Sequence, residues 1–383
     1  MTACRVCGGH IGSATYEVPA PALTSIMTLL DAPTRVFVCA GCGHAQSDDI
    51  PDIQAFYDTG YRISLNSENH DQIFAVSADG AITYRTDHQA ALALRLLDLP
   101  EGASILDYGA AKADTLRKMT VSRSDLRPYV FDVSSDYAAA WQSWVPQAAQ
   151  ATYSVPDAWQ GTFDAIMSHF VIEHVADPVG FMRDVRALLQ PDGAFLFSIP
   201  DVAANPGDMA VADHLNHFSE ASIAYALACA GFRLQTIDKT SFPGAFFVVA
   251  RRIEMATQSA ASSASAEDAA KQAREICEFW DQASGKLRDD TQNYARRKVA
   301  IYGAGFYGSW IYGRIGGSVD VVAFLDRNAS LQGATHFGIP VLPPEELPTE
   351  AEALFIGLNP LKARAAIAAQ PWLQRDGLDH VWL

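Results

Sequence analysis

Two matched pairs of cysteines near the N-terminus have the spacing of metal ligands. Each Cys-x-x-Cys pair can direct two thiolates at one ion from a tight turn, and two such turns complete the tetrahedral shell that suits zinc. The four cysteines are Cys4, Cys7, Cys39 and Cys42. His10 and His44 could compete as ligands, and a dithiol redox pair or a disulfide is the alternative chemistry. We predict a structural zinc ion, because two matched pairs disfavour a lone redox motif and a cytosolic chain disfavours disulfides.

The stretch "ILDYGAAKADTL" (residues 105–116) has the order of a ligand-binding turn in an α/β domain. A buried strand ends in Asp107 and then Gly109, and ligands of such sheets bind off the carboxyl ends of the strands. Alanines at 110, 111 and 113 stand where further glycines are usual. They let the flat edge of a ligand approach, whereas a pyrophosphate needs closer contact and a helix N-terminus. The loop therefore favours a nucleoside without bridging phosphates over NAD.

Polar residues at the ends of the next strands should line the same crevice. The strand "YVFDVS" ends in Asp132, whose carboxylate can accept both hydroxyls of a ribose. Two strands further on, "FDAIMSHFVIEHV" carries Ser168 and His169 toward its far end. We expect these residues and Ala111 of the loop to contact the nucleoside cofactor that binds in this crevice.

A histidine-rich segment supplies candidates for acid–base chemistry. In "VADHLNHFS" (residues 211–219), His214 follows Asp213, and an adjacent acid can orient a histidine or raise its basicity. His217 lies in the same segment, and His174 lies in "IEHV". The alternatives are surface histidines on a loop for His214 and His217, and partly buried polar groups at a strand end for His169 and His174.

The C-terminal part has a glycine fingerprint in "IYGAGFYGSWI". Gly303, Gly305 and Gly308 give G-x-G-x-x-G between a strand and a helix, and Asp326 ends the next strand, as the ribose acid of an NAD site would. Taken alone, this pattern predicts a dinucleotide site. The alternative is a purely structural role.

The elements that must position these residues alternate between strands and helices, which predicts parallel sheets covered on both faces. We expect an α/β protein with a zinc-binding domain at 1–72, a central Rossmann-like domain at 73–255 and a Rossmann-like domain at 298–383. A linker and a long helix occupy 256–297, because "EMATQSAASSASAEDAA" lacks apolar periodicity.

Composition limits the classes of function. With 383 residues, two or three domains are expected. The net charge of −16 disfavours nucleic acid as a partner, since phosphates would be repelled. No stretch approaches the roughly 20 apolar residues of a membrane span, and the N-terminus lacks the pattern of a signal peptide. We expect a cytoplasmic monomer or homodimer that acts on a small-molecule substrate.

The order "ILDYGAAKA", "FDVS", "FDAIMSHFVIEHVADP" and "LLQPDGAFLFSIPD" resembles the class I S-adenosylmethionine-dependent methyltransferases. The resemblance implies that Asp107 and Gly109 cradle the methionine part of the cofactor and that Asp132 binds its ribose. Gly109-Ala110-Ala111 departs from the usual G-x-G of that family.

The order of the whole chain is similar to the sugar C-methyltransferases, which act on nucleotide-linked 4-keto-deoxysugars. That family has a box Tyr-His-Glu-His-Leu-Ser-Tyr-Phe-Ser, and the matching stretch here is 211–219. His214 matches the catalytic histidine and Asp213 takes the place of the glutamate. Val211 and His217 stand where the family has tyrosines.

Further site residues follow from the same resemblance. His174 falls where another functional histidine occurs, and Tyr61 in "FYDTGYRIS" matches a tyrosine of the substrate site. The C-terminal domain helps to bind the nucleotide-sugar in that family. We therefore assign Tyr61 and His217 to the substrate site, together with Gly303, Gly305, Gly308 and Asp326.

The predicted reaction removes a proton next to a ketone, and the resulting enolate attacks the methyl group. His214 would act as the base, assisted by Asp213 and His174. The alternatives are an O- or N-methyltransferase on a sugar or polysaccharide precursor, and an NAD-binding oxidoreductase or nucleotide sensor that uses Gly303–Gly308. A protein that binds S-adenosylmethionine without consuming it, and an inactive scaffold, complete the set.

Overall fold

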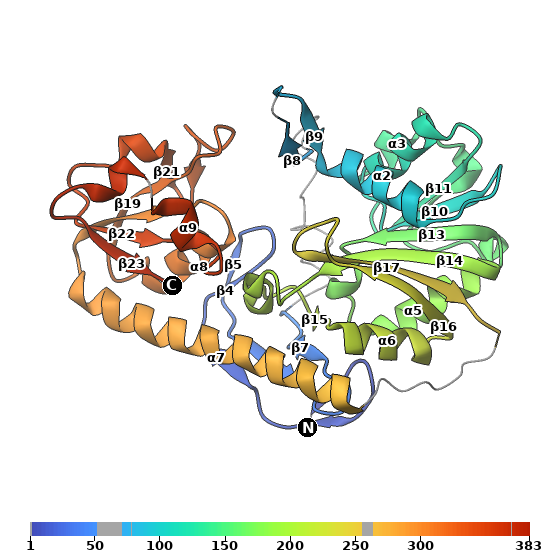
Figure 1. The fold of residues 1–383 in the computed structure, drawn as a ribbon, viewed down its shortest axis with the longest axis horizontal. Coiled ribbons are helices and arrows are strands. Elements are labelled where there is room, and N and C mark those ends of the chain that lie inside the picture. Colours follow the sequence, from blue (N-terminus) through green and yellow to red (C-terminus); the bar gives the residue numbers. More distant parts are fainter. Residues whose placement is uncertain (1, 52–70, 78, 255–262, 369) are drawn as a thin grey trace.

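The computed structural model describes residues 2–51, 71–77, 79–254, 263–368 and 370–383. Three β-sheets of four, six and seven strands organise these residues. The long helix α7 (Ser263–Asn293) runs beneath the C-terminal unit and the N-terminal strands, and one of its ends contacts helix α6 (Glu220–Cys229) (Figure 1). The predicted substrate residue Tyr61 lies outside the described residues. None of the helices in the described ranges is long and apolar enough to cross a membrane.

The seven-stranded sheet is mixed, with strand order β12-β11-β10-β13-β14-β17-β16. Its strands are β10 (Ser104–Tyr108), β11 (Arg127–Asp132), β12 (Gln150–Thr152), β13 (Phe163–His169), β14 (Leu189–Pro200), β16 (Phe232–Asp238) and β17 (Ala245–Arg252). Strand β17 alone runs in the opposite direction to the other six, because it pairs antiparallel with both β14 and β16. Its helices are α2 (Arg85–Leu96), α3 (Asp114–Ser122), α4 (Ala138–Trp141), α5 (Pro178–Leu188) and α6 (Glu220–Cys229).

The predicted cofactor residues meet at one edge of this sheet. Ile105 and Leu106 of β10 are fully buried, so the strand fits the centre of the sheet between β11 and β13. Because these three strands are parallel, their carboxyl ends share an edge, and the chain leaves β10 to build β11 on one side and β13 on the other. Ligands of doubly wound sheets bind where the order reverses in this way. The sequence prediction of an α/β fold with a Rossmann-like central sheet is thus confirmed.

The four-stranded sheet joins the N-terminal segment to the histidine-rich segment. Its order is β15-β7-β6-β3, with β3 (Tyr16–Val18), β6 (Thr34–Val38), β7 (Ala45–Ser47) and β15 (Asn216–His217). In β15, Asn216 pairs with Gln46 and His217 pairs with Ala45. Two short hairpins accompany this sheet, β1 (Thr2–Ala3) with β2 (His10–Ile11) and β4 (Ala22–Leu23) with β5 (Leu29–Leu30). The histidine segment is therefore an edge strand of the N-terminal sheet.

The C-terminal unit is a six-stranded sheet with strand order β20-β21-β19-β18-β22-β23. The strands are β18 (Lys298–Tyr302), β19 (Asp320–Leu325), β20 (Thr335–His336), β21 (Ile339–Leu342), β22 (Ala353–Ile356) and β23 (Asp379–Trp382), and the helices are α8 (Phe306–Ile315) and α9 (Ala363–Ile367). A separate hairpin, β8 (Ile73–Val76) with β9 (Ile82–Tyr84), precedes α2. Short 3₁₀ turns used below are η4 (Ile172–His174) and η5 (Pro206–Ala210).

Helix α7 packs one apolar stripe against the N-terminal strands and the C-terminal unit. Its buried residues recur every three or four positions, the spacing of one helix face; they are Ala266, Ala270, Ala273, Cys277, Trp280, Ala283 and Leu287. The same apolar core contains Val36 of β6, Met209 of η5 and Trp310 of α8. The helix thus ties the three parts together, with the C-terminal unit above one end and the central sheet above the other (Figure 1).

Two of the three fingerprint glycines are required for packing between β18 and α8. A Cβ atom on Gly308 would lie 1.8 Å from the carbonyl oxygen of Gly303, and Gly303 itself has a φ of +97°. Around Gly305, in contrast, no described atom lies within 4 Å of where a Cβ would be. The glycines therefore differ in function although they belong to one motif.

We expect Gly308→Ala to lower the free energy of unfolding by several kcal/mol, on the order of 3, because the new methyl group meets backbone that cannot move away. Gly305→Ala should cost less than about 1 kcal/mol, the difference between these residues at a helix N-cap. Urea denaturation of both variants measures the effect. Equal losses in the two would contradict the packing explanation.

Candidate active site and metal centre

The four N-terminal cysteines come together as predicted. The Sγ atoms of Cys4 and Cys42 are 3.5 Å apart, as are those of Cys7 and Cys39, and all four lie within 4.8 Å of one another. Four thiolates on one zinc ion, each at about 2.3 Å, are separated by roughly 3.8 Å. The cluster therefore fits a tetrahedral Zn²⁺.

Both cysteine turns use the same backbone pattern. The Gly8 N–H donates to the Cys4 carbonyl at 2.9 Å, and the Gly43 N–H donates to the Cys39 carbonyl at 3.0 Å. Both glycines have a φ near +70°, which few other residues adopt. The competing histidines do not join the cluster: His10 is exposed, and the buried His44 is bonded through Nε2 to Asn216 at 3.2 Å.

The loop after β10 has the backbone of a glycine-rich turn with few glycines. Gly109, Ala111 and Ala113 all have positive φ, at 83°, 45° and 58°. A Cβ atom on Gly109 would lie 2.5 Å from Cγ2 of Val171, so only glycine fits there. The two alanines adopt the left-handed conformation that usually selects glycine. The loop therefore keeps its sharp turn although alanine replaces the second glycine of the usual G-x-G motif.

Two carboxylates define the electrostatics of this loop. Asp132 accepts the Ala111 N–H at 2.9 Å and the Ser134 N–H at 3.1 Å, which ties the end of β11 to the loop. Burial raises the pKa of Asp132. Burial, together with the nearby carboxylates of Asp132 and Asp114, raises the pKa of Asp107 to about 8. A ligand with positive charge would relieve this repulsion, so the site suits a cationic nucleoside.

The other two predicted cofactor residues are less accessible. Ser168 is fully buried, and its Oγ has no hydrogen-bond partner within the described part of the chain. His169 is bonded through Nδ1 to Ser198 Oγ of the neighbouring strand at 2.9 Å. Burial lowers the pKa of His169 to about 3, so it is neutral. A contact of either residue with the cofactor stays a prediction.

A chain of buried hydrogen bonds runs through the histidine segment. His214 Nδ1 lies 2.6 Å from Oδ1 of Asp208, and Oδ2 of the same carboxylate lies 3.2 Å from His217 Nδ1. His217 Nε2 then accepts the hydroxyl of Ser47, on β7, at 2.9 Å. Asp208 therefore orients two imidazoles at once, and its own position depends on both neighbours.

The protonation states of the groups in this hydrogen-bond chain follow from their geometry. Burial alone would lower the pKa of His214, but the Asp208 carboxylate, with the charges of Asp213 and Glu173, raises it to about 9. Burial opposes ionisation of Asp208, yet His214 and His217 hold its pKa well below the ordinary value. Burial lowers the pKa of His217. At neutral pH the pair is an imidazolium beside a carboxylate.

His174 approaches His214 with the opposite protonation preference. The ring centroids are 4.7 Å apart and the planes nearly perpendicular. Burial and the positive charge of His214 lower the pKa of His174 to about 4. Its Nδ1–H donates to the backbone carbonyl of Asp213 at 2.9 Å, which leaves Nε2 as the nitrogen without a proton. Two adjacent histidines are thus held in different protonation states.

The two acids beside this pair, Asp213 and Glu173, are held differently. The Asp213 carboxylate accepts both the N–H and the hydroxyl of Ser25 at 2.6 Å, and its Oδ2 is 3.6 Å from His174 Nδ1. Glu173 is 1% exposed, and its Oε2 has no partner among the described residues. Burial raises the pKa of Glu173 to about 8. The nearest donor or acceptor atoms of Glu173, His174 and His214 lie within 4.8 Å of one another.

Asp208 is the residue of this hydrogen-bond chain that the sequence prediction did not identify. It lies in the turn η5, in "NPGDMA", whereas the sequence prediction assigned the role of orienting His214 to Asp213. The Pro-Gly pair marks a turn but does not indicate which histidine the next residue faces. In the C-terminal unit, Asp326 accepts the Ala304 N–H at 2.8 Å, the same arrangement as Asp132 with Ala111.

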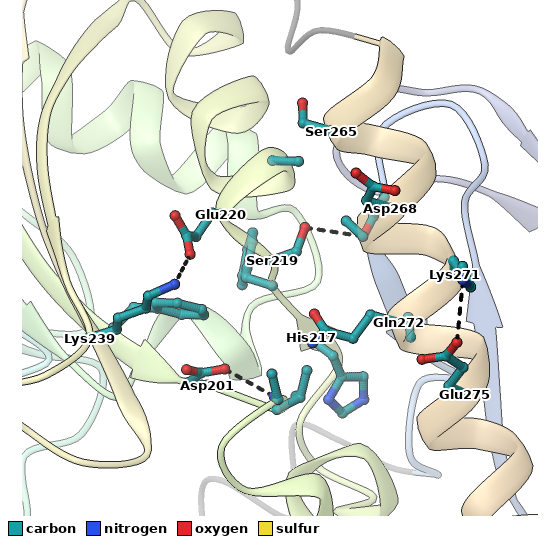
Figure 2. A pocket seen from close by; sticks show the side chains of 18 residues that line it. Asp201, His217, Ser219, Glu220, Lys239, Ser265, Asp268, Lys271, Gln272 and Glu275 are labelled. Atoms are coloured by element: carbon teal, nitrogen blue, oxygen red, sulfur yellow. Dashed lines mark hydrogen bonds and ion pairs between the residues drawn. The ribbon is translucent and has the colours of Figure 1, made fainter.

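A cavity of about 520 Å³ opens between α6 and α7, beside the buried hydrogen-bond chain (Figure 2). His217 and Ser219 line one wall, and Asp268 and Gln272 of α7 line the other. An ion pair of 2.5 Å between Lys239 and Glu220 borders it. His217 reaches this cavity, whereas His174, His214 and the loop after β10 do not line it.

The central part of the chain matches a known family. Residues 83–237 match the model of a methyltransferase domain. The S-adenosylmethionine-dependent methyltransferase from Mesorhizobium loti is 18% identical with a TM-score of 0.36, over 45% of this chain and 99% of that one. The corresponding enzyme from Aquifex aeolicus is 17% identical with a TM-score of 0.35, over 43% and 89%. The chain has no significant match among curated proteins. Residues 83–237 therefore form a methyltransferase domain.

Proposed function

We propose that the protein methylates a carbon next to the ketone of a nucleotide-linked keto-sugar. The observation that carries this proposal is a buried pair of histidines with ring centroids 4.7 Å apart, in which His214 contacts a carboxylate and His174 contacts a backbone carbonyl. S-adenosylmethionine supplies an electrophilic methyl group on a positively charged sulfur. The chain's own task is to hold that cofactor and to move a proton of the acceptor.

The edge formed by β10 and β11 would hold the cofactor. The loop at 109–113 gives its sharp turn, and Asp132 stands where it can accept ribose hydroxyls. Asp107, whose pKa burial and neighbouring carboxylates raise to about 8, would become ionised beside a positive ligand. Ala111, Ser168 and His169 complete the proposed contacts.

The histidines divide the proton chemistry. His174 is neutral and can accept the proton that leaves the carbon. His214 is protonated and can donate a hydrogen bond to the ketone oxygen while negative charge develops there. The sequence predicts His214 as the base. In this proposal His174 is the base instead, because it is the neutral member of the pair. Asp213 assists by fixing the tautomer of His174 through its backbone carbonyl.

This division of roles supports carbon as the acceptor. Methyl transfer to oxygen or nitrogen needs a base but creates no enolate, so it gives a protonated histidine nothing to stabilise. The similarity of chain order to the sugar C-methyltransferases supports the sugar. Tyr61, His217, the fingerprint glycines and Asp326 remain its proposed contacts.

Calorimetric titration with S-adenosylhomocysteine should show binding that Asp132→Asn weakens about 10- to 100-fold, because the charged acceptor at the strand end is lost. The matched control is Asp326→Asn, which removes the equivalent carboxylate of the C-terminal unit and should leave this affinity unchanged. Binding of NADH that only Asp326→Asn abolishes would instead support the oxidoreductase or sensor alternative.

Hydrogen–deuterium exchange at the carbon next to the ketone, followed by NMR in D₂O with S-adenosylhomocysteine present, tests the proton chemistry without methyl transfer. The rate should rise through pH 4 as His174 loses its proton and fall through pH 9 as His214 loses its own. Four other titratable groups face this pair and help to set the two pH limits of the exchange rate: Asp208, Asp213, Glu173 and His217. His174→Asn should slow exchange roughly 10²- to 10⁴-fold.

The control for this exchange is His336→Gln, which alters a histidine bonded to Ser309 in the C-terminal unit and should leave the rate unchanged. A rate that continues to rise toward pH 9 and then stays level would assign the base to His214 instead. Methylated product with the new group on oxygen or nitrogen would exclude C-methylation.

We also propose that the cysteine cluster holds one structural zinc ion. Mass spectrometry of metals should give one equivalent per chain, and Cys42→Ser should release it and lower the melting temperature, because the metal is bound only by the folded chain. Cys229→Ser, outside the cluster, is the matched control. A second equivalent that His174→Asn removes would place a metal ion in the histidine pair and contradict its acid–base role.

A further inference from the structure

The turn η5, which carries Asp208, is held by residues from outside the methyltransferase domain. The hydroxyl of Tyr307, in the first turn of α8, donates to Asn205 Oδ1 at 2.8 Å and accepts the Gly207 N–H at 3.0 Å. The indole N–H of Trp280, in α7, donates to the Pro206 carbonyl at 2.7 Å. Three consecutive residues, the last of them next to Asp208, are thus bonded to the C-terminal unit and to α7.

Packing leaves these contacts little freedom. The Tyr307 ring stacks on Trp280 with centroids 6.1 Å apart and planes within 15°, and the two side chains are 9% and 0% exposed. Trp310 packs against the same indole at 4.6 Å. A Cβ atom on Gly207 would lie 2.8 Å from the Tyr307 hydroxyl, so the backbone of the turn lies directly on the tyrosine. Movement of the ring would therefore move the turn.

The backbone transmits this position to the carboxylate. The Asp208 N–H donates to the Asn205 carbonyl at 3.0 Å, and the Asp208 carbonyl accepts the Val211 N–H at 3.1 Å. With both backbone groups fixed, the side chain reaches His214 at 2.6 Å. A charge-assisted hydrogen bond of this length depends on close geometry.

We infer that Tyr307, supported by Trp280, is a positioning residue for the histidine pair: the C-terminal unit holds η5 so that Asp208 faces His214. This role of α8 differs from ligand binding. The side chain of Tyr307, two residues after Gly305, is bonded to the turn η5 of the methyltransferase domain. The catalytic consequence rests on the proposed function, whereas the placement of Asp208 does not.

The test is Tyr307→Phe in the full chain, which removes the hydroxyl and keeps the ring. The pKa of His214, followed by NMR of labelled histidines and assigned with His214→Gln, should fall by about one unit or more as the carboxylate loses its fixed position. The alkaline limit of the hydrogen–deuterium exchange profile should fall with it. Affinity for S-adenosylhomocysteine should stay within about twofold, because the cofactor loop is untouched. Asp208→Asn should give a larger shift in the same direction.

Two further variants make the outcome specific. Tyr302→Phe is the matched control, because this buried tyrosine packs on Trp372 within the C-terminal unit and should leave the pKa of His214 unchanged. Asn205→Ala removes one partner of the Tyr307 hydroxyl and should reproduce part of the shift, even where Tyr307→Phe fails to fold. A folded Tyr307→Phe with an unaltered pKa of His214 would overturn the inference. A shifted pKa in a protein that never exchanges or methylates a keto-sugar would uphold the positioning and reject the proposed substrate.

Discussion

The buried pair of His214 and Asp208 is the interaction on which the arrangement of this protein depends. A carboxylate and an imidazolium that are both removed from water gain little unless their geometry is close and their remaining atoms are bonded. Each of the three β-sheet units in the described part of the chain contributes to meeting that condition. The N-terminal sheet supplies Ser47 to His217, and the turn η4 after strand β13 of the central sheet supplies His174 and Glu173. Helices α7 and α8 hold the turn that carries Asp208.

The N-terminal cysteine unit is part of this support. Arg5, next to Cys4, donates to the carbonyls of Ser47 and Leu215, and so joins the cysteine turn to β7 and to the histidine segment. Burial lowers the pKa of Arg5, while Asp49 and Asp48 oppose that effect. The histidine segment is thus held by a unit far away in sequence, through the pairing of β15 with β7 and the contact of Arg5 with Leu215.

Much of the fold and part of the candidate site could be predicted from local sequence patterns. The cysteine turns, the strand and loop at 105–116 and the alternation of strands and helices each depend on neighbouring residues, and each appears as expected. The partner of His214 could not be found in this way. Asp213 is adjacent in sequence, but its side chain is turned toward Ser25, while Asp208 reaches His214 through a turn that other domains hold in place. Such a contact depends on tertiary packing and has no short-range signature.

The same reasoning explains why the number of glycines in the two loops does not predict what each loop does. Both α/β units bond the acid after their second strand to a loop N–H, Asp132 to Ala111 and Asp326 to Ala304. In the central unit, alanines accept left-handed backbone, so the turn survives with one glycine in place. In the C-terminal unit, Gly303 and Gly308 meet each other in the packing of strand and helix, and Tyr307 beside them is bonded to η5. A complete fingerprint can therefore serve packing between a strand and a helix, while a sparse one keeps the backbone of a glycine-rich turn. The φ angle and the neighbouring atoms, rather than the number of glycines, decide what each position requires.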